Sequence, residues 1–190
     1  MNAALVKIEA KTSTVIGQLV ELEDDARKLM SEGQTPAAYI QVLQEQKLYA
    51  DAIRFLAMAL PKREAVWWAC VAARTMMPKE VQPQEVATIS AAEAWVYQPT
   101  EENRRQAMAY AEAAEFKTAA SWAATAAFWS AGSMSPPEAP VVPPGPDLTA
   151  KAVTGAVLLA ASVAEPEKLD EVYVRLLGIG LDIAQGGKGV

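Results

Sequence analysis

The chain has 190 residues, of which 52% are hydrophobic, and it carries a formal net charge of −6 at pH 7 with no histidine and a single cysteine, Cys70. Histidine and cysteine supply most metal ligands, general bases and nucleophiles near neutral pH, so this composition excludes a histidine triad and argues against zinc sites and thiol catalysis. The negative charge disfavours nucleic acid or an anionic membrane as the main partner.

The sequence indicates a cytoplasmic protein. One cysteine cannot form an internal disulfide, and residues 1–11 lack the basic start and apolar run of a secretory signal. The most apolar stretch, residues 152–163, is shorter than the ~20 residues needed to cross a bilayer. We therefore expect no membrane span and no membrane partner.

Residues 1–33 are predicted to form an N-terminal arm followed by a helix. Apolar residues recur at alternating steps of three and four from Leu5 to Leu29, which is the heptad pattern of a helix that pairs with a partner. The run Thr12-Ser13-Thr14 and Gly17 disfavour a stable helix at its start. We expect a frayed arm and then a helix from about Thr14 to Glu32, and whether the arm becomes ordered on a partner stays open.

Residues 34–185 are predicted to form one helical domain, and residues 186–190 a mobile tail. Thr35, Thr100, Thr118 and Thr149 are expected to cap helices, and prolines that fit the first helical turn precede several of the apolar periodic stretches. No stretch alternates with period two, so the predicted fold class is all-α, a single-domain bundle of about seven helices. The expected helices are 36–60, in one piece or broken near Gln46-Lys47, then 62–77, 83–96, 101–116, 119–131, 149–163 capped by Thr149, and a last one beginning at 165–167.

Residues 133–147 contain six prolines and one glycine, and such a segment forms neither a helix nor a central strand. We expect a long extended loop, called the proline loop below. A partner that recognises extended prolines is one interpretation. The adjacent Val141 and Val142 favour the other, in which the loop packs on its own domain.

The remaining polar patterns do not indicate chemistry. Gly178-Ile179-Gly180 lacks the strand and third glycine of a nucleotide loop, so close helix packing explains it better. Glu112 and Glu115 share a helix face and, with Glu93, are the only candidates for a divalent cation, but they match no known ligand signature. Cys70 fits a small buried hydrophobe. The sequence predicts no catalytic residue, no metal and no cofactor.

The candidate functional residues are those expected to contact another protein. Arg63 precedes Trp67-Trp68, and two adjacent tryptophans on a helix cannot face the same core, so one of them lines a groove or both are buried between different helices. The candidate partner-binding residues are Arg63, Trp67, Arg104, Arg105, Trp129, Leu19 and Leu22.

Several segments together resemble an uncharacterised bacterial family of helical domains. The resemblance spans about Pro36 to Gln185 and implies an association with type VI secretion loci, with no activity carried to any residue. The segments are the LPKREAVWWAC block (60–70), 101–105, 127–133, the proline loop and the GLDIA end (180–184).

The residues and the resemblance point to the same function. We expect a non-catalytic adaptor or chaperone that holds another protein, such as a secreted effector. The main alternative is an immunity protein that blocks a basic toxin, and an enzyme that uses only carboxylates, arginine or tyrosine is less favoured.

Overall fold

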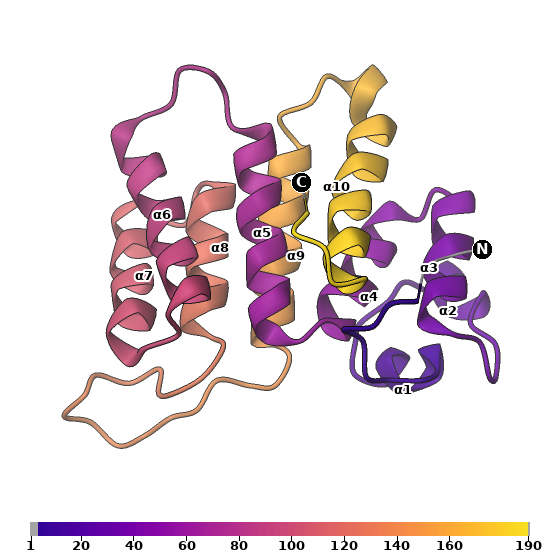
Figure 1. Ribbon diagram of the computed structural model, residues 1–190, viewed down its shortest axis with the longest axis horizontal. Coiled ribbons are helices and arrows are strands. Elements are labelled where there is room, and N and C mark those ends of the chain that lie inside the picture. Colours follow the sequence, from indigo (N-terminus) through magenta and orange to yellow (C-terminus); the bar gives the residue numbers. More distant parts are fainter. Residues whose placement is uncertain (1–3, 190) are drawn as a thin grey trace. The chain divides into compact units, whose positions relative to one another are not determined.

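The computed structural model describes residues 4–189, and this part of the chain contains ten α-helices, one 3-10 helix and no strand (Figure 1). The predicted all-α fold is therefore confirmed. The helices form two compact units. We call residues 62–160 the central unit, and residues 4–61 with 161–189 the terminal unit.

The terminal unit is built on helices from both ends of the chain. Helices α3 and α4 pack as an antiparallel pair, and α1 and α10 both pack on α4. Tyr39 and Phe55 meet edge to face between α3 and α4, with ring centroids 4.8 Å apart. The helices are α1 (Ser13–Gly17), α2 (Asp24–Lys28), α3 (Pro36–Glu45), α4 (Tyr49–Ala59), the 3-10 helix η1 (Pro166–Lys168) and α10 (Leu169–Ala184).

The single helix expected from Thr14 to Glu32 is wrong, because α1 ends at Gly17 and α2 begins at Asp24. Polar contacts hold the intervening residues in a non-helical path. Asp51 of α4 accepts a hydrogen bond from the main-chain N–H of Glu23 at 3.1 Å, and Arg27 donates to two carbonyls that precede α2. These partners satisfy backbone groups that a continuous helix would otherwise pair.

The same contacts place residues 13–33 in the terminal unit together with α3 and α4. The Tyr39 hydroxyl donates to the carbonyl of Ala26 in α2 at 2.7 Å, and both residues are fully buried. The division of the chain into units thus differs from the boundary expected after residue 33.

A left-handed residue separates α3 from α4. Lys47 has φ of 58°, and the N–H of Leu48 donates to the carbonyl of Leu43 at 2.8 Å. This geometry ends a helix by satisfying its last carbonyls. Residues 36–60 therefore form two helices that break at the position considered in the sequence.

Residues 186–189, expected to be mobile, fold back on the end of α10. The N–H of Gly187 donates to the carbonyl of Asp182 at 2.9 Å, and that of Gly189 donates to the Asp182 carboxylate at 2.8 Å. Residue 190, the rest of the predicted tail, lies outside the described residues.

The central unit is a bundle in which α6, α7 and α8 pack on one another and α5 packs on α6 and α8. Alanines fill much of its core and allow the helices to approach closely. Gly155 of α9 serves the same purpose, because a Cβ there would lie 3.4 Å from the ring of Trp122 in α8. The helices are α5 (Lys62–Met76), α6 (Pro83–Tyr97), α7 (Glu101–Ala113), α8 (Ala119–Phe128) and α9 (Leu148–Ala161), the last residue of α9 being counted with the terminal unit.

Three of the four threonines expected to cap helices do so. Thr35, Thr100 and Thr118 accept hydrogen bonds from the main-chain N–H three residues ahead, at 3.3, 3.2 and 3.1 Å. The prediction for Thr149 is wrong, because α9 begins at Leu148 and the Thr149 hydroxyl donates to the carbonyl of Trp129 at 2.9 Å.

Among the described residues, no helix combines the length and the apolar character that crossing a membrane requires.

Candidate protein-binding site

Most of the predicted partner-binding residues gather at one end of the central unit. At this end α5 and α7 begin, α6 and α8 end, and the proline loop leaves α8 (Figure 1). Lys62 of α5 donates to the carbonyl of Ser130 at 3.0 Å, and Arg63 donates to that of Val96 at 2.6 Å. We call this region the loop end.

Arg104 is the centre of the loop end, and it is buried, with 2% of its surface exposed. Its guanidinium donates to the carbonyls of Phe128 at 2.6 Å and Ser133 at 2.8 Å, and forms two hydrogen bonds with Glu101, at 2.6 and 2.8 Å. The cation also lies 4.4 Å from the centroid of the Phe128 ring. A positive charge at the end of α8 is favourable, because the carbonyls there carry partial negative charge. The prediction that Arg104 contacts a partner is therefore wrong, since these bonds hold α7, α8 and the proline loop together.

Arg105 joins the same network from a more exposed position. It donates to Glu101 at 2.6 Å and to the carbonyl of Ser135 in the proline loop at 3.1 Å. The Glu101 carboxylate is thus shared by two arginines. The hydrogen bonds from Arg104 are the largest cause that lowers the pKa of Glu101 to about 2, and Arg105 adds to it. Glu101 stays ionised at neutral pH and fixes both cations.

The two adjacent tryptophans of α5 have different surroundings. Trp68 is fully buried, whereas Trp67 is half-buried. Trp67 meets Tyr97 of α6 edge to face, with ring centroids 5.7 Å apart, and 69% of Tyr97 is exposed. The interpretation in which both tryptophans are fully buried does not fit the structure, and a groove lined by Trp67 stays a prediction. Arg63 is also exposed on this surface.

The proline loop closes on itself. The N–H of Met134 donates to the carbonyl of Val142 at 2.8 Å, and the N–H of Val142 donates to the Ser133 hydroxyl at 3.1 Å. Val141 is 76% exposed and Val142 is 46% exposed, so the expectation that these valines pack on the domain is wrong. Arg104 and Arg105 attach the loop by bonding to its main-chain carbonyls.

A hollow of about 500 Å³ lies between the proline loop and the first turn of α7. One wall is charged and the other is mainly proline, alanine and valine. The lining residues are Glu101, Glu102, Arg105, Ser133, Pro136, Pro137, Ala139 and Val141.

The other predicted contact residues do not belong to the surface that Trp67 and Tyr97 form. Trp129 is half-buried and lies edge to face with Trp122, at 6.3 Å between centroids. Leu19 and Leu22 belong to the terminal unit. Leu19 is 64% exposed, but Leu22 is buried, which corrects its prediction as a partner contact.

Of the groups considered for chemistry, Glu93 has an internal partner and Cys70 is buried. Glu93 accepts two hydrogen bonds from Arg74, at 2.6 and 2.7 Å. Cys70 is fully buried, and burial raises the pKa of its thiol. Within residues 4–189, no three acidic or cysteine side chains stand close enough together to hold a metal ion. Close packing does not explain Gly178, because a Cβ there would meet nothing within 4 Å.

Sequence reasoning missed Tyr97 and Lys62. Tyr97 is the last residue of α6 and stands two positions before Pro99. A large aromatic residue at the end of a helix, where the chain leaves the core, is the signal that could have identified it. Nothing local identifies Lys62, since its partner Ser130 is 68 residues away.

A comparison with protein families matches residues 39–184, which include the whole loop end. The chain belongs to DUF6931, a family of unknown function. No curated protein and no solved structure matches the chain. That the chain belongs to a family without an assigned function agrees with the resemblance, while a bacterial origin of the family and its association with type VI secretion loci stay predictions.

Proposed function

We propose that this protein is a non-catalytic adaptor or chaperone that binds another protein through the loop end of its central unit. The observation that carries the proposal is the surface made by Trp67, Tyr97 and Arg63. Tryptophan, tyrosine and arginine are the residues most enriched at the energetic centres of protein interfaces. A tyrosine exposed to 69% at a helix end, against a half-buried tryptophan, matches this composition and supports the proposal.

The proline loop leaves α8 at the same end of the central unit (Figure 1). Its main chain is fixed by Arg104 and Arg105, so the exposed side chain of Val141 is held in place before any partner arrives. Preorganisation of this kind lowers the entropy lost on association.

The net charge of −6 favours a basic partner, because opposite charge accelerates encounter and discriminates against acidic proteins. A cytoplasmic location, predicted from the cysteine content and the residues at 1–11, and a secreted effector as the bound protein, which the resemblance implies, complete the proposal.

Affinity capture with the tagged full chain, followed by calorimetry with the purified partner, tests the proposal. We expect Trp67→Ala with Tyr97→Ala to weaken binding at least tenfold, since hot-spot truncation commonly costs about 2 kcal/mol or more. Tyr110→Ala, at a half-buried aromatic on α7, is the matched control. If a correctly folded double variant binds its partner as tightly as the wild type, the loop end is not the binding surface.

A second measurement separates an adaptor from an immunity protein. An adaptor stabilises or delivers its bound protein, and the partner alone is harmless to the cell. An immunity protein restores growth to cells that express the partner. Reproducible turnover by the purified chain would contradict both.

A further inference from the structure

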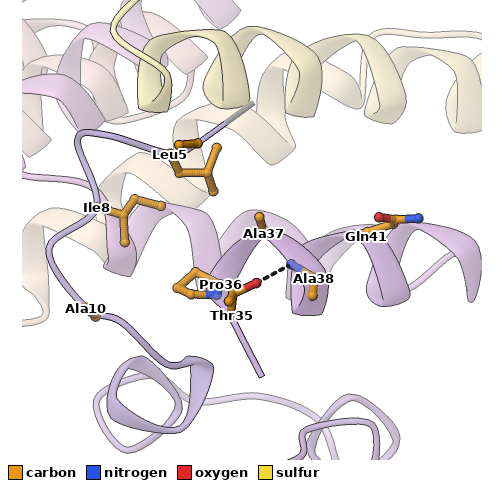
Figure 2. A pocket seen from close by; sticks show the side chains of 9 residues that line it. Leu5, Ile8, Ala10, Thr35, Pro36, Ala37, Ala38 and Gln41 are labelled. Atoms are coloured by element: carbon orange, nitrogen blue, oxygen red, sulfur yellow. Dashed lines mark hydrogen bonds between the residues drawn. The ribbon is translucent and has the colours of Figure 1, made fainter. Parts of the chain in front are cut away.

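The terminal unit contains a groove that the chain's own N-terminal arm only partly fills. Residues 4–10 cross the start of α3 and the end of α10 (Figure 2). Leu5 lines one hollow of this feature together with Ala37 and Ile40 of α3 and Leu181 of α10. We call this feature the arm groove.

A tight turn presents the arm to this groove. The N–H of Ile8 donates to the carbonyl of Leu5 at 2.9 Å, which closes the turn. Leu5 and Ile8 are half-buried, whereas Val6 between them is 68% exposed. The N–H of Lys7 donates at 2.9 Å to the carbonyl of Ala184, the last residue of α10. The arm therefore offers two aliphatic side chains, at the first and fourth positions of a turn, and one main-chain donor.

Space remains under the arm. An open hollow of about 400 Å³ is lined by Ala4, Leu5, Ile8 and Ala10 of the arm and by residues 35–38 and Gln41 of α3 and its cap. A smaller one of about 150 Å³ lies between Leu5, α3 and α10. Two half-buried aliphatic side chains are a weak anchor, because the stabilisation scales with the apolar area removed from water.

We infer that the arm groove is a binding site for a segment of another protein, and that the arm is a tethered competitor for it. The segment that fits forms a turn with apolar side chains at its first and fourth positions, as the arm itself does. In this segment, the residue two positions after the first apolar residue donates its main-chain N–H to the carbonyl of Ala184, as Lys7 of the arm does. The arm is attached to the same molecule and therefore competes at a high effective concentration. A partner segment displaces it only if its own concentration and affinity outweigh those of the arm. This site is independent of the loop end proposed above.

A synthetic, fluorescently labelled peptide of residues 2–12 is the probe, and the full chain is the receptor. In the variant Leu5→Asp with Ile8→Asp, the arm leaves the groove, since two carboxylates cannot remain unpaired against its apolar walls. Fluorescence anisotropy should show saturable binding of the peptide to this variant and binding at least tenfold weaker to the wild type. Absence of saturable binding to the folded variant, or equal affinity for both proteins, overturns the inference.

Two further substitutions in the released-arm variant locate the bound peptide. Ala37→Glu places a charge on the groove wall and should abolish binding. Gln46→Glu adds the same charge at the exposed end of α3 and should leave binding unchanged. Loss of binding with both, or with neither, contradicts the assignment to the groove.

A measurement on the wild type keeps the inference testable if the variant does not fold. Excess unlabelled peptide should accelerate hydrogen exchange of the Lys7 amide, because it displaces the arm from Ala184. An unchanged exchange rate overturns the inference. A concentration-dependent dimer in which arms are exchanged would assign the groove to a second copy, and would also overturn the partner proposed here.

Discussion

The guanidinium of Arg104 lies 2.9 Å from the point where a Cβ on Gly132 would stand. Gly132 also has φ of 68°, which is the left-handed region. We therefore expect Gly132→Ala to lower the free energy of unfolding by about 2 kcal/mol, through backbone strain and displacement of a buried cation. Urea denaturation followed by circular dichroism measures it.

Gly33 is the matched control, because it has φ of 73° but nothing within 4 Å of its Cβ position. Gly33→Ala should lower the free energy of unfolding by only about 1 kcal/mol, which is the cost of the left-handed conformation for alanine. Equal losses at the two positions would show that contact with Arg104 does not matter.

Arg104 should be far more important for stability than its neighbour in the sequence. Arg104→Lys removes the planar guanidinium that bonds Phe128, Ser133 and Glu101 together, and we expect a loss of about 3 kcal/mol. Arg105→Lys, at a partly exposed site, should lose less than about 1 kcal/mol. Thermal and urea unfolding of both variants provide the test, and a larger loss for Arg105 would refute our view of the network.

The ion pairs of Glu101 predict a pH dependence at acid pH. Hydrogen bonds from Arg104, aided by Arg105, lower the pKa of Glu101 from 4.5 to about 2 in the folded protein. Because the folded pKa lies below the unfolded one, the carboxylate stabilises the fold fully above pH 4.5, and this contribution is lost as the pH falls from 4.5 towards 2.

Glu101→Gln should therefore be less stable than the wild type at pH 7, and the difference should shrink between pH 4.5 and 2. Urea midpoints measured across this range report the difference. Glu102→Gln is the control, because among the described residues this neighbouring carboxylate forms no ion pair, and its effect at pH 7 should be smaller. A difference for Glu101→Gln that stays constant down to pH 2 would contradict the prediction.

Two glycines near the C-terminus should respond to alanine in opposite directions. At Gly187 a Cβ would lie 2.1 Å from the Asp182 carboxylate, so Gly187→Ala must displace the group that accepts the N–H of Gly189. We expect Gly187→Ala to lower the free energy of unfolding by about 1–2 kcal/mol. Gly178 lies within α10 with open space around it, so Gly178→Ala should gain about 0.5–1 kcal/mol from helix propensity. Differential scanning calorimetry of the two variants gives both signs.

The sequence predicted what depends on neighbouring residues. Thr35, Thr100 and Thr118 mark helix starts because a cap involves only the next three residues. The six prolines of 133–147 exclude a helix for a reason that is equally local. Most helices were accordingly placed within a few residues of their ends.

Features that depend on distant partners were not predictable in this way. The heptad spacing between Leu5 and Leu29 indicated a helix, but Asp51, in another helix, holds Glu23 in a non-helical path. The prediction of Arg104 as a partner contact did not anticipate its burial. Its partners Phe128 and Ser133 lie 24 and 29 residues away, and only the folded chain brings them to it.

The hydrogen bonds that close the proline loop bear on how a bound protein would meet it. Ser133 and Met134 pair with Val142, and two arginines clamp the stem, so the order of this segment is established when the chain folds. Its tip behaves as a fixed ridge, and binding to it need not immobilise a nineteen-residue tether between α8 and α9. Selectivity would then come from shape, because the loop would not rearrange to fit a molecule whose surface does not match the ridge.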